Sequence, residues 1–475
     1  MRFLPHALVT CLLAACPVQA KPDANLLGLI RAELADSANG ETLLALADRL
    51  SPGQSRPAVP FSGLPGSQAP AKVRAGEIQA ALTQLSILSG GNGHLALYLA
   101  QASGTDVIHV VSGVATLSDL GDLIQRRTTG WHLSRPLVVW PGAALILGPG
   151  EELQLDTASG AFLLSFGDVR MTGATLRGDT GTNPTVPTFR PFLLVTGQGT
   201  LWAEKSTFAD LGFRGPVAFR GVTVLTGGLM KPAVSPVILD SRFESVFSLS
   251  FEGADGMNVS GNRFAGAGAA AISIHDGVRI LLADNRISGT TEGAGIRLSG
   301  ALRKVTLVAN LVSNGGRNGV QIDGATHGLV LQGNVITGNA QTGVSIRNAS
   351  CVAVQGNIIA MNGTTGLRLS QSGTARIADN TILSNAGSGI ELAAQSGLGP
   401  VLLSDNALAS NREGLRAAGL GEVRLRGNNL AKQLPRQFAG DFAPWLGAYL
   451  TADAAFIIPA AAGKQTVSSD PCQME

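Results

Sequence analysis

Residues 319–334 read GVQIDGATHGLVLQGN, and residues 343–357 repeat the pattern as GVSIRNASCVAVQGN. In both stretches, apolar and polar side chains alternate after a glycine, and the run closes on an asparagine. Alternation with a period of two is typical of a strand that buries one face. These two stretches belong to a longer series of repeats, and that series decides the fold.

The series is marked by eight asparagines that recur at steps of 22 to 26 residues. They are Asn262, Asn285, Asn310, Asn334, Asn357, Asn380, Asn406 and Asn428. Helical repeats need roughly 33 or more residues per unit, so this period is too short for them. The repeat therefore predicts an all-β fold, a right-handed parallel β-helix. Asparagine tolerates left-handed backbone, and stacked amides hydrogen-bond their neighbours, so we expect a structural role for these residues.

Composition agrees with a long solenoid. The chain has 475 residues with 61 glycines, 14% charged and 45% hydrophobic residues, which excludes a mainly disordered chain. A solenoid grows in one dimension, so a single stack and a monomer are expected. The net charge of +2 neither favours nor excludes a nucleic-acid surface, and we expect no nucleic-acid partner. The sequence carries no zinc spacing, phosphate-binding loop or calcium repeat, so no metal or cofactor is expected.

The N-terminus predicts export. Residues 1–20 resemble a signal peptide that ends in Val18-Gln19-Ala20, which places the protein in the periplasm. Alternatively, Leu13 to Cys16 has the form of a lipobox, which makes Cys16 a candidate lipidation site and implies an outer-membrane lipid anchor. After cleavage at Ala20, only Cys351 and Cys472 remain. Their pairing stays open, and we interpret Cys351 as a small buried hydrophobic side chain.

The repeat also divides the chain. Residues 21–90 are predicted to form a helical N-terminal region with a Pro/Gly-rich linker, and a helix is expected from Gly76 to Leu88. Short strands are expected from Leu95 onward. The β-helix is predicted over residues 91–430, and residues 431–475 form a C-terminal cap that hides the last open edge.

Superimposing the repeats on their asparagines turns the sequence into columns, because equivalent positions in successive coils lie ~4.8 Å apart. Two outward-facing columns result. The first contains Ser250, Ser273, Arg297, Gln321, Ser345, Arg368 and Glu391, and the second contains Glu252, His275, Ser299, Asp323, Arg347 and Ser370. We call these two columns the polar strip. It predicts a surface that meets a linear polymer at regular intervals.

Within the polar strip, His275 is the main candidate for chemistry. Glu252 lies one coil before it, Asp276 follows it in the chain, and Arg297 lies one coil after it. An imidazole exchanges protons near neutral pH, a carboxylate orients it, and a guanidinium neutralises an acidic substrate. The alternative interpretation is a solvated histidine among ordinary surface charges.

From about Leu133 to Leu430 the chain resembles the periplasmic alginate C-5-mannuronan epimerases, right-handed β-helix enzymes that convert mannuronate to guluronate within the polymer. The matching pieces include Phe189 to Phe192, Met230 to Pro232 and Ile238 to Glu244, in order along the chain. The family signature Tyr-Gly-x-Asp-Pro-His-Asp falls on residues 270–276. Its His-Asp end is kept as His275-Asp276.

The same alignment shows departures from the family. The tyrosine of the signature falls on Ala270, its first aspartate on Ser273 and its proline on Ile274. The family's arginine that neutralises the substrate carboxylate falls near Gly300, so Arg297 or Arg303 has to substitute for it.

The resemblance implies an isomerase in which neutral His275 removes the hydrogen on sugar carbon 5. Arg297 stabilises the substrate carboxylate, and water held by Ser273 or Asp276 returns a proton. The polar strip and the matching pieces give a predicted substrate-binding set. It contains Glu252, Lys231, Arg190, Arg303, Gln321, Asp323 and Arg347.

Three other functions stay open at this point. A polysaccharide lyase shares the first step but expels the group at carbon 4. A non-catalytic polysaccharide-binding scaffold in an exopolysaccharide secretion complex fits the lost signature residues. A surface or tail-fibre adhesin predicts a trimer. We expect an exported β-helix enzyme that acts on an acidic polysaccharide such as alginate.

Overall fold

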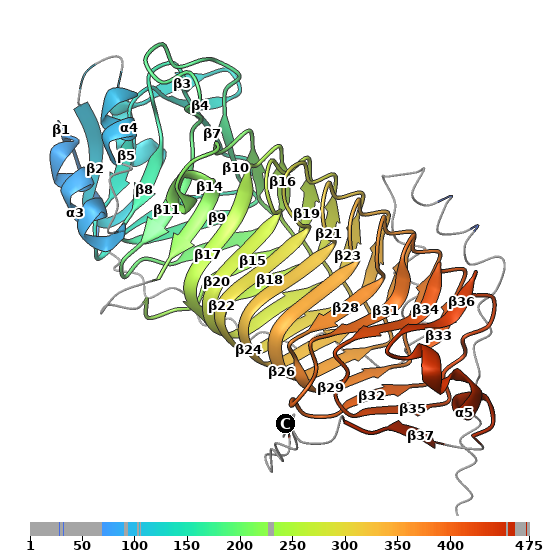
Figure 1. The fold of residues 1–475 in the computed structure, drawn as a ribbon. Coiled ribbons are helices and arrows are strands. Elements are labelled where there is room, and N and C mark those ends of the chain that lie inside the picture. The colour runs from blue at the N-terminus through green and yellow to red at the C-terminus, as the bar shows by residue number, and fades with distance from the viewer. Residues whose placement is uncertain are drawn as a thin grey trace, which may run out of the picture.

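Two long sheets form an elongated body that runs from β1 to β37 (Figure 1). The computed structural model describes residues 69–89, 94–101, 106–226, 232–452 and 455–460, with the single residues 28, 32, 104 and 472. One sheet has 24 strands and the other has 13. Within both sheets nearly every neighbouring pair is parallel and about one repeat apart in sequence, as in Val320 opposite Val344. The predicted all-β parallel β-helix is confirmed.

The 24-stranded sheet winds around two sides of the body, and several of its strands are long and bent. Its strands are β1 Lys72–Glu77, β2 Asp106–Thr116, β5 Leu137–Val139, β6 Ala143–Leu147, β8 Leu163–Ser165, β9 Asp168–Thr172, β11 Leu193–Thr196, β12 Leu201–Glu204, β14 Gly221–Leu225, β15 Val237–Leu239, β17 Ser248–Asp255, β18 Asn258–Ser260, β20 Ile272–Ala283, β22 Ile296–Val308, β24 Val320–Gln332, β26 Val344–Gln355, β28 Leu367–Ser370, β29 Gly373–Ala378, β31 Ser388–Ala393, β32 Val401–Ser404, β34 Glu413–Ala418, β35 Val423–Arg426, β36 Arg436–Gly440 and β37 Ala455–Ile458.

The 13-stranded sheet forms the remaining side with short strands, one from most coils. Its strands are β3 Gln125–Arg127, β4 Gly130–Leu133, β7 Glu152–Leu155, β10 Thr175–Gly178, β13 Thr207–Ala209, β16 Arg242–Glu244, β19 Arg263–Ala265, β21 Arg286–Ser288, β23 Leu311–Ser313, β25 Val335–Thr337, β27 Ile358–Ala360, β30 Thr381–Leu383 and β33 Ala407–Ala409. The helices are short: α3 Gln79–Ser89, α4 His94–Leu99, α5 Leu446–Leu450 and the 3-10 turns η1 Ser118–Leu123, η2 Val217–Phe219 and η3 Ala443–Trp445.

The interior is one continuous apolar column. Successive coils place Ile272, Ile296, Val320 and Val344 above one another, and each is almost completely buried. Burial of such side chains stabilises a fold by roughly 1.5–3 kcal/mol each, so the stack is held mainly by its core. The outward side chains between them are free to vary.

The eight asparagines form a hydrogen-bonded ladder, as predicted. The Asn285 side-chain amide donates to Asn310 Oδ1 (2.9 Å) and to the Val259 carbonyl (2.8 Å), while the Asn285 backbone N–H also donates to Asn310 Oδ1. The left-handed residue is not the asparagine but the one before it, as at Asp284 (φ 54) and Gly333 (φ 60). The side-chain amide, not the backbone, is the reason for asparagine at this position.

A second asparagine ladder was not predicted. It follows the 13-stranded sheet and contains Asn339, Asn362, Asn385 and Asn411. Each side-chain amide donates to the next Oδ1 at 2.9 to 3.0 Å, and all four side chains are buried. The same repeat spacing marks it in the sequence.

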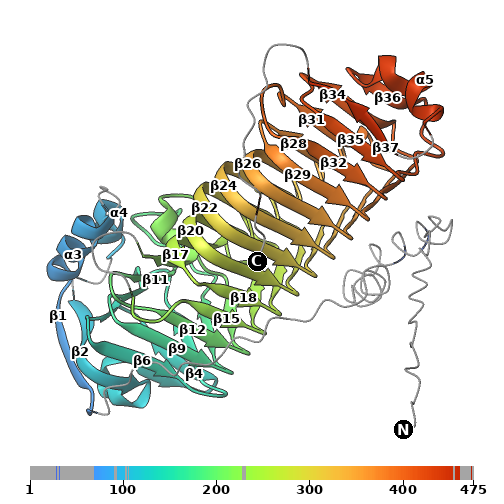
Figure 2. The same ribbon diagram turned by 90° about the horizontal axis from the view of Figure 1, so that it is seen from below.

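The N-terminal end of the stack is covered by a strand and two helices (Figure 2). Strand β1 pairs antiparallel with β2, and α3 and α4 pack against Phe162, Phe192 and neighbouring aromatic rings on the outer face of the 24-stranded sheet. Two boundaries differ from prediction, because Gly76 lies in β1 and Leu95 in α4. A large apolar cluster thus forms outside the core and favours helices there.

At the other end, the coil continues further than the asparagine repeat. Strand β36 still pairs parallel with β34, and β37 then runs antiparallel to β35. The Tyr449 hydroxyl on α5 donates to the Asn428 carbonyl (3.1 Å), which terminates the first ladder. The last open strand edges are thereby covered.

Cys351 and Cys472 are joined by a disulfide with Cα atoms 5.3 Å apart. Cys351 is buried, as expected, but the interpretation as a free apolar side chain is wrong. The predicted signal peptide with Cys16, the helices of residues 21–50 except positions 28 and 32, and the linker up to residue 68 lie outside the described residues. No helix in the described part of the chain is both long and apolar enough to cross a membrane.

Candidate functional site

The two columns of the polar strip lie in register on the outer face of strands β17, β20, β22, β24, β26, β28 and β31. Glu252 pairs with His275, His275 with Ser299 and Ser299 with Asp323, while Ser273 pairs with Arg297 and Arg297 with Gln321. One member is wrong. Ser250 is 1% exposed and its hydroxyl contacts Ser248, so it does not belong to the open surface.

His275 is exposed on β20 and held by two neighbours. Its Nδ1 lies 3.1 Å from Ser299 Oγ, and its Nε2 lies 3.7 Å from Asp276 Oδ2. The Ser299 hydroxyl in turn reaches the Ile274 carbonyl at 3.4 Å. Each ring nitrogen of His275 therefore has one polar neighbour, Ser299 at Nδ1 and Asp276 at Nε2.

Asp276 is fixed by the backbone of the next coil. It has a positive φ of 56, and the Ala301 N–H donates to its Oδ1 at 2.6 Å. Gly300, which has φ +79, makes room for this carboxylate: a Cβ there would overlap Asp276 Oδ1 and lie 3.0 Å from His275 Cε1. An arginine at position 300 is therefore excluded with this backbone, and the substrate-neutralising charge has to come from elsewhere.

A pocket of about 380 Å³ opens beside the first column of the strip. Its lining includes Ser273, Arg297 and Gln321, which were predicted, and Arg214, Arg220 and Arg317, which were not. We call it the arginine pocket. Arg214 and Arg220 come from the loop between β13 and β14, and Arg317 precedes β24. None of the three belongs to a column of the repeat, so superimposing the repeats did not find them.

The arginine pocket is short of negative charge. Glu292 at its edge forms an ion pair with Arg214. Among the described residues, no carboxylate forms an ion pair with Arg220, Arg297 or Arg317. Burial and then the nearby charge of Arg297 lower the pKa of Arg220, because both disfavour its cation. An anion in the pocket relieves this repulsion.

Small side chains form one wall of the arginine pocket. Ala269 and Ala270 line it, and Ala270 occupies the position of the tyrosine in the epimerase signature. No aromatic ring therefore stands at this position of the pocket wall.

The other predicted substrate-binding residues are scattered. Arg303 is exposed beyond the bend of β22 and pairs in register with His327, not with His275. Arg190 lines a separate hollow with Asp179 and Asp210, and its guanidinium donates to the Phe189 carbonyl. Lys231 lies outside the described residues.

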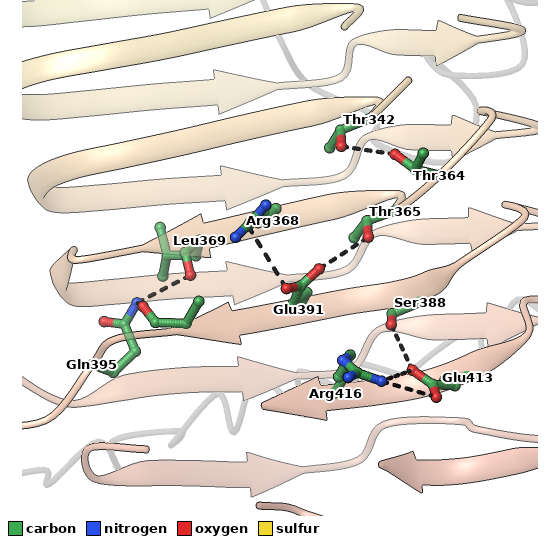
Figure 3. Close-up of polar contacts among 11 residues, drawn as sticks. Thr342, Thr364, Thr365, Arg368, Leu369, Ser388, Glu391, Gln395, Glu413 and Arg416 are labelled. Carbon is green, nitrogen blue, oxygen red and sulfur yellow. Dashed lines mark hydrogen bonds and ion pairs between the residues drawn. The ribbon is translucent and has the colours of Figure 1, made fainter. Parts of the chain in front are cut away.

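The C-terminal part of the strip is internally paired (Figure 3). Arg368 faces Glu391, which also accepts a hydrogen bond from Thr365, and Arg416 donates to both oxygens of Glu413. Asp323 and Arg347 form a similar pair, with Nε donating to Oδ1 at 2.7 Å. We call the six charged residues the paired strip: Asp323, Arg347, Arg368, Glu391, Glu413 and Arg416.

Comparison with known proteins gives a curated relative. Over 237 residues the chain is 27% identical to the mannuronan C5-epimerase of Pseudomonas aeruginosa, which covers 45% of this chain and 44% of the relative. The chain is thus similar to this epimerase over slightly less than half of its length. The resemblance inferred from the signature residues is confirmed, although the match spans less than half of the relative's length.

Solved structures agree on the fold. The crystal structure of the periplasmic alginate epimerase AlgG superimposes with a TM-score of 0.64 at 19% identity, over 82% of this chain and 99% of that one. The family described as periplasmic copper-binding protein (NosD) also matches residues 249–429.

The residues of the NosD match do not fit a copper site. All of residues 249–429 are described, and no three His, Cys, Asp or Glu side chains there present ligand atoms within 4.8 Å of one another. The cysteine in this range, Cys351, is in a disulfide. The likeness to that family is therefore one of coil sequence.

Proposed function

We propose that this protein is a periplasmic isomerase that epimerises uronate residues at carbon 5 within an acidic polysaccharide such as alginate. The observation that carries the proposal is the position of His275. Its imidazole lies on the same strand face as the arginine pocket, two residues from Ser273 in that pocket. A proton acceptor and an anion-binding pocket on one strip are the two elements that the reaction requires.

The reaction follows from this geometry. The uronate carboxylate enters the arginine pocket, where Arg297 and Arg220 stabilise the charge that develops as carbon 5 loses its hydrogen. His275 Nε2 takes that proton, and Asp276 stabilises the resulting imidazolium from 3.7 Å. Water held at Ser273, in the space beside Ala270, donates a proton to the opposite face of carbon 5. The hydroxide that remains is neutralised by the proton that the His275 imidazolium releases through solvent. The sugar then leaves with its configuration inverted.

A non-catalytic polysaccharide-binding scaffold is the second candidate. Ala270 and Ser273 favour it, because they replace the tyrosine and the first aspartate of the signature. In this proposal the arginine pocket binds uronates and His275 is a surface residue.

One incubation separates the candidates. The mature protein is mixed with polymannuronate in deuterated water, and the polymer is then analysed for deuterium at carbon 5, for guluronate and for unsaturated chain ends. Deuterium with guluronate is expected. Unsaturated ends instead indicate a lyase, and measurable binding without deuterium indicates the scaffold.

Four further expectations about location and assembly remain proposals. Export to the periplasm is supported by the similarity to AlgG and to the NosD family, both of which are described as periplasmic. The lipid anchor at Cys16, the secretion complex and the monomeric state follow from the sequence alone. Fractionation of cells and size measurement of the purified mature protein test them.

A further inference from the structure

Three side chains gather at the N-terminal end of the stack, several coils from the polar strip. His132 lies in β4, Asp156 directly follows β7, and Asp179 directly follows β10 (Figure 1). These strands are neighbours in the 13-stranded sheet. One ligand atom from each side chain lies within 4.8 Å of the other two.

Strand register places the two aspartates in a column that asparagines fill elsewhere. Gln154 and Arg177 align through successive coils with Thr337. Asp156, Asp179 and Asn339 each lie two residues after these positions, so the two aspartates occupy the column of the second ladder. An asparagine amide donates to the oxygen of the next coil, as Asn339 does to Asn362 at 3.0 Å. An ionised carboxylate has no proton to donate, so two stacked aspartates repel unless a cation or a shared proton joins them.

Both aspartates are only partly satisfied by the backbone. Asp179 Oδ1 accepts from the N–H groups of Thr157 (3.0 Å) and Gly181 (3.2 Å), and Asp156 Oδ1 accepts from Ala158 (3.0 Å). Burial on its own raises the pKa of Asp179, but its hydrogen bonds outweigh burial and lower it.

His132 supplies the independent observation. Its side chain is only 6% exposed, and Nδ1 is buried without a hydrogen-bond partner in the described part of the chain. Such an atom costs about 1–3 kcal/mol if it stays unpaired. Burial and then the charge of Arg127 lower the pKa of His132.

We propose that His132, Asp156 and Asp179 bind one divalent transition-metal ion, with zinc as the preferred ion. The bound ion links three successive coils. One imidazole nitrogen with two carboxylate oxygens suits Zn²⁺, whereas Ca²⁺ and Mg²⁺ prefer oxygen ligands throughout. Ligands at about 2.1 Å from a tetrahedral ion lie about 3.4 Å from one another, so a contraction of at most about 1.4 Å closes the set. Water completes a fourth position.

The position of the cluster indicates a structural role. Asp179 begins the loop that carries Asn183, whose amide donates to the Ala100 carbonyl (2.7 Å) just after α4 and to the Thr157 carbonyl (3.3 Å). Fixing Asp179 against Asp156 therefore also fixes the loop on which α4 rests. This role is independent of the proposed epimerase activity.

The test uses the full chain without a histidine tag, stripped with a chelator and then titrated with Zn²⁺ alone. Metal content is measured by mass spectrometry after desalting, and the unfolding midpoint is followed at each step. The variants are His132→Gln and Asp179→Asn, which nearly keep the size of the side chain. Asp179→Asn also keeps an oxygen that accepts the hydrogen bond from the Thr157 N–H. Asp210→Asn is the matched control, because Asp210 lies one coil away near Arg177 and outside the cluster.

Wild type and Asp210→Asn are expected to retain one zinc per chain. At a free zinc concentration 100-fold above the dissociation constant, the ratio of folded to unfolded protein rises by about 100-fold. His132→Gln and Asp179→Asn are expected to fold, as judged by circular dichroism, and to lose both the bound zinc and the shift. Less than about 0.2 zinc per wild-type chain, or equal binding by the variants, overturns the proposal.

Discussion

The arginine pocket and the paired strip lie on the same face of the same stack, but their charges are arranged differently. In the pocket, Arg220, Arg297 and Arg317 have no carboxylate partner among the described residues. In the paired strip, each cation has a carboxylate one coil away or three residues along the strand, as Arg416 has Glu413. The core is the same in both regions, so the difference comes from the outward residues and from the loop that carries Arg214 and Arg220.

The difference in charge pairing between the two regions indicates where an anionic polymer is expected to bind. An arginine that already has a carboxylate partner gains little from a uronate, because one charged contact only replaces another. Exposed pairs of this kind contribute about 0–1 kcal/mol, so breaking one is possible but gives no net attraction. A polymer that lies along the strip is therefore anchored at the pocket. The paired strip supports it without fixing its register.

Replacing His275 gives the largest expected effect. His275→Ala removes the proposed proton acceptor, and general-base catalysis is worth about 10²–10⁴-fold in rate. We expect deuterium exchange at carbon 5 to fall by that factor, while binding of polymannuronate stays within about twofold. Exchange is measured by mass spectrometry of the digested polymer.

The chain offers a matched control for this variant. His327 is also exposed, and its Nδ1 lies 3.0 Å from Ser350 Oγ, nearly as His275 lies from Ser299. It does not line the arginine pocket. His327→Ala is therefore expected to keep full exchange. If both variants lose exchange equally, or neither does, His275 is not the base.

The ladder provides a stability test in both regions. Asn285→Ala leaves the Asn262 amide without its acceptor and the Val259 carbonyl without its donor, which costs about 3 kcal/mol of unfolding free energy. Asn380→Ala does the same in the C-terminal coils. Urea unfolding is expected to give equal losses within about 1 kcal/mol. A much smaller loss at one position contradicts the view that the two regions share one scaffold.

The sequence predicted the structural features that depend on the repeat period. Alternation and the asparagine steps are local patterns repeated many times, so the parallel coils, the buried column through Ile296 and the register of Glu252, His275 and Ser299 were all predictable. The pairing of Asp323 with Arg347 also follows from columns, since the two lie one coil apart. Superposition of repeats finds contacts between equivalent positions.

The superposition of repeats missed the contacts that lie outside the columns. Arg214 and Arg220 reach the pocket from an irregular loop, and no period relates them to Arg297. The bond between Cys351 and Cys472 spans 121 residues, and the position of the later cysteine depends on a tail without repeats. Ser250 was placed on the surface because alternation gives the face of a side chain but not what covers that face.

Arg297→Ala is expected to have an intermediate effect. Hydrogen bonds to a charged group are worth about 1.5–3 kcal/mol, so affinity for polymannuronate is expected to fall by about 10–100-fold. Arg368→Ala, three coils further along the same column and in the paired strip, is expected to change affinity less than twofold. Binding is measured by calorimetry at two salt concentrations. Equal losses for the two variants contradict the distinction between the arginine pocket and the paired strip.

The smallest effect is expected from Glu413. Partial burial on its own raises the pKa of Glu413, but hydrogen bonds from Arg416 and Ser388 outweigh it and hold the pKa below its ordinary value of 4.5. A carboxyl with a depressed folded pKa adds stability above its unfolded pKa, and this stability is lost as the pH falls through the folded value. Glu413→Gln is therefore expected to lower the unfolding free energy by about 1 kcal/mol at pH 7. The difference is expected to disappear well below pH 4, as measured by urea unfolding at both pH values, and carbon-5 exchange is expected to be unchanged. A stability difference that persists in acid shows that Glu413 acts through packing and not through its charge, and the paired strip then loses its electrostatic explanation at this position.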